Sequence, residues 1–351
     1  MHSRKLRLRE ITLGLIIGAT GVAAQAVTPN DPLYPVATPG ANGLPMNYQW
    51  GLHRLNLGPA WDLATGHAYL AVIDSGIDVD HPDLISNFRP RFSYNFVSGN
   101  ADVDEGKLLG AGHGTHVAGI MAAEADNGIG TAGICWHCSL MVADMWNTAG
   151  SGTVSIKADA MKWAVDNGAQ VINQSFGREA SDYLVGDYTC DTLPSTFWGS
   201  ANADEAAAAK YCDTLAYADE FDVVIVAAAG NGIRDMSIPA IQFPASDPRV
   251  IAVGAVDIAG DATPQPNSIA IDANVGSDQQ LAFNEGPEKD LVAPGFNVLS
   301  TLYVNSVWND IEDLNTRFHP ECGDYIDENT QVTPIMPLSL IHISEPTRPL
   351  H

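Results

Sequence analysis

The sequence is poor in basic residues. Only 17 Lys and Arg residues stand against 42 Asp and Glu residues in a chain of 351, which gives a formal net charge of −25. That charge argues against nucleic acid or an anionic membrane as a partner, because both would repel the protein. Charged residues make up only 17% of the chain and hydrophobic residues 46%, so neither intrinsic disorder nor a coiled coil describes the whole chain.

Long apolar runs are scarce as well, and the run at residues 11–24 is too short to cross a bilayer. It follows a cluster of Arg and Lys residues and ends in the small-residue triplet Ala24-Gln25-Ala26, which is the pattern of a secretory signal peptide. A membrane anchor is the weaker alternative, because a spanning helix needs about 20 apolar residues. We therefore expect residues 1–26 to be removed on export. The mature protein should be secreted, either extracellular or periplasmic, with no membrane association after cleavage.

Cysteine is also rare, with five residues in the chain, and export makes each one a candidate for a disulfide. Cys135 and Cys138 form a Cys-Trp-His-Cys element. This element is compatible with a zinc half-site, a redox pair, a local disulfide or two buried thiols. Cys190 and Cys212 flank a polar, alanine-rich stretch, and a disulfide between them would tie down a surface insertion. Cys322 is left over as the odd cysteine.

What the chain does contain is an alternation of apolar strand-like runs and helical patterns. The expected strands cover residues 69–73, 140–143, 171–173, 223–229 and 250–256, and the expected helices cover residues 113–124, 155–167 and 203–220. The strand runs are continuously apolar, as parallel strands covered on both faces are. The pattern predicts one α/β domain with a doubly wound, mostly parallel sheet and helices on both faces.

Three polar residues follow the expected strands or begin an expected helix, where active sites of such sheets lie. Asp74 ends the first strand, His113 begins a helix between two glycines, and Asn231 follows a strand with glycine on each side. Alone, each has a simpler explanation: Asp74 could cap its turn, and Asn231 could form an Asn-Gly turn. His113 and His116 could also share a metal, although the spacing of zinc helices is different. An unhindered amide such as Asn231 suits an oxyanion hole.

Taken together, the local sequences resemble those of the subtilisin-like serine proteases, the subtilases. The motifs that carry the resemblance are AVIDSGIDVDHPDL at residues 71–84, GHGTHVAGI at 112–120, INQSFG at 172–177, VVIVAAAGN at 223–231 and VAPG at 292–295. The similarity covers residues 48–300, and the first two motifs are highly specific. The order Asp before His distinguishes this family from chymotrypsin-like enzymes and α/β-hydrolases.

The resemblance implies a secreted serine endopeptidase that acts on protein or peptide substrates. Asp74 would orient His113, His113 would act as general base, and Asn231 would donate to the oxyanion. The segment Ser175, Phe176 and Gly177 would line the substrate cleft, where its backbone could pair with an extended peptide. No cofactor is needed for this chemistry, and we expect a monomer.

The resemblance also implies a calcium site that contains Asp83 and Asn127. Calcium takes about six to eight oxygen ligands, so a single carboxylate is a poor site by itself.

One essential part of the family pattern is missing from the sequence. After VAPG, subtilases carry a Gly-Thr-Ser-Met-type segment whose serine is the nucleophile, and no serine after residue 295 has those neighbours. Residues 338–351, LSLIHISEPTRPLH, resemble translated sequencing adapter. We therefore expect a partial peptidase domain at residues 27–337 and an artefact at 338–351, so that the chain as written is inactive. The alternative functions are a non-catalytic subtilase-like peptide-binding protein and a Cys/His metal protein.

Overall fold

A computed structural model describes the part of the chain that forms the sheet, its helices and several connections. The described residues are 27–34, 49–105, 112–146, 152–177, 188–192, 205–229, 241–256, 291–294 and 300–301. The signal peptide at 1–26, Asn231, Cys322, the segment at 338–351 and Gly295 of the VAPG motif lie outside them.

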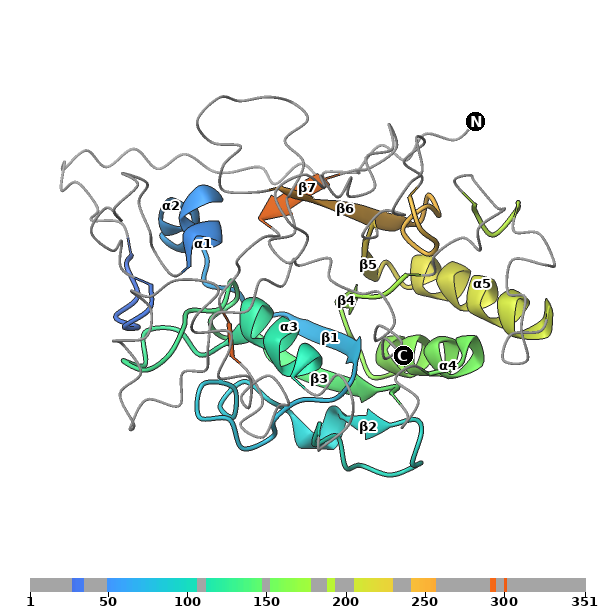
Figure 1. Ribbon diagram of the computed structural model, residues 1–351, viewed down its shortest axis with the longest axis horizontal. Coiled ribbons are helices and arrows are strands. Elements are labelled where there is room, and N and C mark those ends of the chain that lie inside the picture. The colour runs from blue at the N-terminus through green and yellow to red at the C-terminus, as the bar shows by residue number, and fades with distance from the viewer. Residues whose placement is uncertain are drawn as a thin grey trace, which may run out of the picture.

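The centre of the fold is a seven-stranded sheet in the order β2-β3-β1-β4-β5-β6-β7 (Figure 1). All six neighbouring pairs are parallel. The strands are β1 (Tyr69–Asp74), β2 (Tyr94–Asn95), β3 (Ser139–Asp144), β4 (Val171–Gln174), β5 (Val224–Ala228), β6 (Val250–Val256) and β7 (Leu291–Pro294). The expected α/β architecture is confirmed.

Helices cover both faces of this sheet. Alternate residues of a strand point to opposite faces, and in these strands both faces carry apolar residues. On β1, Leu70 and Val72 belong to an apolar cluster with residues of α3 (His113–Ala122). Ala71 and Ile73 belong to the opposite cluster, with residues of α4 (Val154–Asp166) and α5 (Glu205–Glu220). The helices α4 and α5 also pack against each other (Figure 1).

The boundaries of the helices follow local sequence signals. Thr153 caps α4, since its hydroxyl accepts a hydrogen bond from the Ile156 amide at 3.2 Å. Gly168, which follows this helix, has φ +86°, a conformation that glycine adopts without strain. Shorter helices at α1 (Trp50–Arg54), α2 (Leu57–Trp61) and the 3-10 turn η1 (Pro90–Phe92) complete the described elements. None of the described helices is long and apolar enough to cross a membrane.

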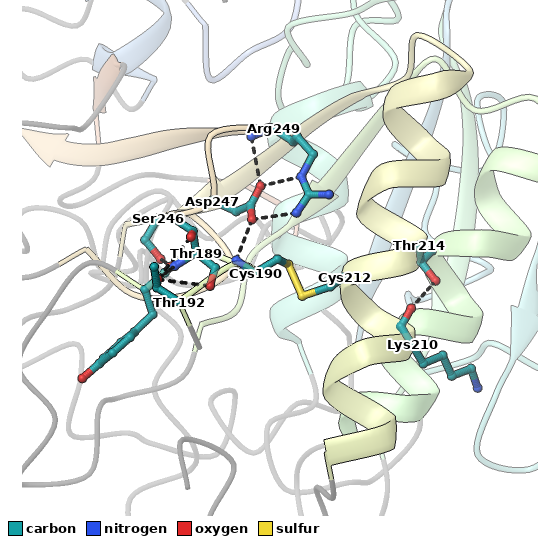
Figure 2. Close-up of a disulfide and its surroundings, with 10 residues drawn as sticks. Thr189, Cys190, Thr192, Lys210, Cys212, Thr214, Ser246, Asp247 and Arg249 are labelled. Carbon is teal, nitrogen blue, oxygen red and sulfur yellow. Dashed lines mark hydrogen bonds and ion pairs between the residues drawn. A yellow bond between two sulfur atoms is a disulfide. The ribbon is translucent and has the colours of Figure 1, made fainter. Parts of the chain in front are cut away.

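Two disulfides form in the structure, Cys135–Cys138 and Cys190–Cys212. The first occupies the Cys-Trp-His-Cys element, so the cysteines of this element are neither free thiols nor zinc ligands in this state. The second joins the segment at 188–192 to α5 (Figure 2). Asp247 holds the same segment, because its carboxylate accepts a hydrogen bond from the Cys190 amide at 3.0 Å.

Candidate active site

Asp74 and His113 meet at the carboxyl end of the sheet. Asp74 is the last residue of β1 and His113 the first residue of α3. His113 Nδ1 lies 2.7 Å from Asp74 Oδ1, and the same oxygen accepts a hydrogen bond from the Ser75 amide at 2.8 Å. Two segments 39 residues apart in the sequence are thus joined at a buried carboxylate.

A close backbone approach makes this contact possible. A Cβ atom at Gly114 would lie 2.0 Å from the carbonyl oxygen of Gly76, closer than non-bonded atoms can come. Gly76 itself has φ +91°, in the region that disfavours other residues. The glycines in the two motifs therefore allow the turn after β1 and the first turn of α3 to touch.

The contact with Asp74 determines which imidazole nitrogen of His113 can accept a proton. The side chain of Asp74 is 2% exposed and that of His113 is 16% exposed, so the carboxylate lies inside and the imidazole reaches the surface. When Nδ1–H donates to Asp74, the Nε2 of His113 carries a lone pair. This arrangement suits a general base that accepts a proton from a nucleophile.

Two more buried carboxyl groups lie near the Asp74–His113 pair. Asp144 ends β3 and is the register partner of Asp74. Burial raises the pKa of Asp144 to about 7; hydrogen bonds from the Trp146 amide and the Asn95 side chain lower it, and the charge of Asp74 raises it. Burial likewise raises the pKa of Glu105 to about 7. The carboxyl end of β1 is therefore an acidic, poorly hydrated environment.

The segment expected to line the cleft follows β4. Asn173 Nδ2 donates to Ser175 Oγ at 2.8 Å, and the Phe176 ring is packed in the core with the Lys157 ammonium 4.5 Å from its centroid. A Cβ atom at Gly177 would lie 2.5 Å from Gln242 Oε1, which is buried and has no hydrogen-bond partner in the described part of the chain. Because the Ser175 and Phe176 side chains are buried, the backbone is the part of this segment that could face a peptide.

The match to known families decides how this site should be interpreted. Residues 66–329 match the model of the Subtilase family, a stretch that contains β1, α3 and all the strands that follow them. The chain belongs to the subtilase family. The contact between Asp74 and His113 thus joins the motif at residues 71–84 to the motif at residues 112–120 in a member of this family.

Several relatives of this subtilase have names that state their activity. The chain is 34% identical over 282 residues to a "Thermophilic serine proteinase" of Bacillus sp. strain AK1, covering 80% of this chain and 54% of that protein. It is 31% identical over 292 residues to the "Halolysin-like extracellular serine protease Nep" of Natrialba magadii, covering 82% and 42%. It is 33% identical over 234 residues to subtilisin E of Bacillus subtilis strain 168, covering 66% and 48%. The chain spans about half the length of these curated relatives.

A second polar cluster of this subtilase surrounds Asp83. Its Oδ1 accepts from Asn127 Nδ2 at 3.0 Å and its Oδ2 from the Thr131 amide at 2.8 Å. Burial raises the pKa of Asp83, and the charge of Asp31, which is buried nearby, adds a smaller increase. Asp31 Oδ1 has no hydrogen-bond partner among the described residues. No three or more His, Cys, Asp or Glu side chains cluster as metal ligands in the described part of the chain.

Sequence reasoning missed three buried acids that the structure brings to these clusters, Asp31, Glu105 and Asp144. Asp144 could have been found, because it follows an apolar strand just as Asp74 does. Asp31 and Glu105 lie in irregular segments, and no periodicity or turn motif predicts that such residues will be buried. Asn231 lies outside the described residues, so its expected role stays a prediction.

Proposed function

We propose that this chain is part of a secreted serine endopeptidase that hydrolyses peptide bonds through an Asp-His-Ser triad. The observation that carries the proposal is the 2.7 Å contact between His113 Nδ1 and Asp74 Oδ1 in a member of the subtilase family. The relative from Natrialba magadii is named extracellular, which supports secretion by way of the signal peptide at residues 1–26.

In the proposed mechanism, Asp74 holds the Nδ1–H of His113, and Nε2 removes the proton of the serine hydroxyl as its oxygen attacks the peptide carbonyl. Asn231 donates to the oxyanion that forms. The imidazolium then gives its proton to the leaving amine, and the acyl-enzyme is hydrolysed by water that His113 activates in the same way. The backbone of Ser175–Gly177 would align the peptide beside this centre.

The serine of this triad is proposed to be encoded beyond the codon for Pro337, and residues 338–351 to be adapter-derived. The test is to sequence the gene past that codon and to express its complete product. We expect a Gly-Thr-Ser segment and labelling of its serine by a fluorophosphonate, with labelling lost in His113→Ala. A confirmed gene end without that segment, and a product that binds peptides without being labelled, would replace the enzyme with a peptide-binding protein.

We also propose that Asp31, Asp83 and Asn127 hold a structural calcium ion. The buried carboxylates of Asp31 and Asp83, and an Asp31 Oδ1 with no hydrogen-bond partner among the described residues, fit a hard cation that prefers oxygen ligands. Calcium would stabilise the loop at 126–131 and take no part in the chemistry. Calorimetric titration with Ca²⁺ should show one site that is lost in Asp31→Asn and retained in Asp213→Asn, a change of an exposed acid on α5. Equal binding by both variants would contradict the proposal.

A further inference from the structure

Glu105 is a buried carboxyl group with four hydrogen-bond donors around it, and the mechanism above does not use it. It is 1% exposed. Its Oε1 accepts from the Gly114 amide at 3.1 Å and from the Ser75 hydroxyl. Its Oε2 accepts from the Thr115 amide at 3.2 Å and from the Thr115 hydroxyl. A single side chain therefore binds both the turn after β1 and the first turn of α3.

These two turns carry the members of the Asp74–His113 pair. Ser75 directly follows Asp74, and Gly114 directly follows His113. The backbone of Glu105 is itself fixed, because its amide donates to the Ile77 carbonyl at 2.9 Å. Glu105 is thus placed to set the distance between the carboxylate and the imidazole.

The Ser75 hydroxyl connects Glu105 to Asp74 more directly. Its oxygen lies within hydrogen-bond distance of Glu105 Oε1 and 3.2 Å from Asp74 Oδ1, and it accepts from the Gly114 amide at 3.0 Å. A hydroxyl has one proton and two acceptor sites. It can therefore donate to Glu105 or to Asp74, but not fully to both.

We propose that Glu105 is a positioning residue whose protonation state decides whether the Ser75 hydroxyl donates to Glu105 or to Asp74. When Glu105 is ionised, it accepts the hydrogen bond of the Ser75 hydroxyl, and Asp74 keeps its full charge for His113. Protonated Glu105 donates to Ser75 Oγ, and Ser75 turns its proton to Asp74 Oδ1. In that state the Asp74 carboxylate is better solvated by its own donors and holds the imidazolium less strongly. The inference rests on the proposed function, since it assigns the exchange a catalytic consequence.

The electrostatic surroundings place this exchange near neutral pH. Burial, the largest effect, raises the pKa of Glu105 to about 7, the hydrogen bonds from Ser75 and Thr115 lower it, and the charge of Asp74 raises it. The ionisable group whose charge acts on Glu105 is Asp74 at the end of β1, and Asp144 of β3 is the register partner of Asp74. Both states of Glu105 are therefore populated near neutral pH, and His113 should be the stronger base above this range.

The test is to follow the protonation of His113 by NMR in the complete gene product with labelled histidine, assigning its signal by its loss in His113→Ala. Glu105→Gln keeps the shape of the side chain and removes its charge, so we expect the titration midpoint of His113 to fall by about 0.5 unit. The matched control is Asp104→Asn, which removes one charge from an exposed neighbour in the same loop and should shift the midpoint by less than half as much. An unchanged midpoint in Glu105→Gln would overturn the proposal.

Ser75→Ala provides an independent variant if Glu105→Gln folds poorly. It leaves Glu105 its bonds to α3 and removes the hydroxyl that donates to Asp74 when Glu105 is protonated, so the His113 midpoint should rise. Loosening of the site alone would move both variants in the same direction, and that result would also contradict the proposal. The NMR measurement does not depend on a nucleophile. If the proposed function is wrong, the complete gene product will not hydrolyse peptides, but the midpoint of His113 can still respond to Glu105→Gln. The two failures can therefore be distinguished.

Discussion

Buried carboxyl groups in the described part of the chain are held in two different ways. The Asp247 side chain, 1% exposed, faces a guanidinium: Arg249 Nε and Nη2 donate to its two oxygens at 2.7 and 2.8 Å (Figure 2). Burial is the largest single effect and acts to raise the pKa of Asp247, but the hydrogen bonds from Arg249 and from the Cys190 amide, together with the Arg249 charge, outweigh it and the pKa is lowered. Glu105 and Asp144 accept hydrogen bonds from neutral donors and keep a pKa of about 7. The charge of Asp247, beside the disulfide, is thus neutralised by Arg249, whereas Glu105 and Asp144, near His113, can still gain or lose a proton near neutral pH.

We predict that Arg249→Met lowers the free energy of unfolding by about 3 kcal/mol, because it leaves the Asp247 carboxylate buried without its partner. Urea unfolding of the two proteins measures the difference. The matched control is Lys162→Met, which removes an ion pair with Asp166 whose side chains are 53% and 42% exposed; because solvent screens an exposed pair, it should lower the free energy of unfolding much less than Arg249→Met does. Equal losses in the two variants would mean that the burial of Asp247 does not matter.

At the scale of secondary structure, continuous apolar runs predicted five strands of the sheet, and the structure has each of them within a few residues. They did not predict β2 or β7, because Tyr94–Asn95 has only two residues and Leu291–Pro294 only four, the last of them proline, which is too little for a pattern. The Asp74–His113 pair could be predicted from the sequence because both residues belong to regular elements. Asp74 and His113 lie at the ends of regular elements, whereas Glu105 reaches them from an irregular segment that only the folded chain brings close.

The two disulfides should differ in their contribution to stability, because they close loops of different length. Cys190 and Cys212 are separated by 22 positions, and Cys135 and Cys138 by 3. A chain-entropy estimate gives about 3.4 kcal/mol for the longer loop and about 1.6 kcal/mol for the shorter one. Replacing each pair by serine and measuring denaturant unfolding should show the larger loss for Cys190/Cys212. The reverse order would indicate that the Cys135–Cys138 bond stabilises the region in another way.

At the scale of the whole molecule, the excess of acidic residues affects the interior as well as the surface, because several of these acids are buried. A formal net charge of −25 repels itself within a compact chain. Among the described residues, Asp74, Glu105 and Asp144 gather at one end of β1 and β3, so ionising all of them at once would concentrate charge in a poorly hydrated place. Because folding buries such a group, the group keeps its proton in the folded state at a pH where the unfolded chain has lost it. The stability of the fold therefore depends on pH.

We predict that the folded protein loses stability as the pH rises from 6.5 to 8. Burial raises the pKa of Glu105 from 4.5 and of Asp144 from 3.8, in both cases to about 7, so the folded chain binds protons that the unfolded chain has already released. Their contribution is complete below the ordinary pKa values and is lost as the pH rises through about 7, by about 1 kcal/mol per group over this interval. Burial lowers the pKa of His81, but its effect on stability is confined to pH values below its ordinary pKa of 6.5.

Thermal unfolding at a series of pH values measures this loss. Glu105→Gln and Asp144→Asn should each flatten the decline, because each removes one proton-binding group from the folded state, whereas Asp213→Asn on the exposed face of α5 should leave it unchanged. A melting temperature that rises across the interval would contradict the assignment of neutral-range protons to these two carboxyls. A decline that neither variant alters would place those protons on other groups.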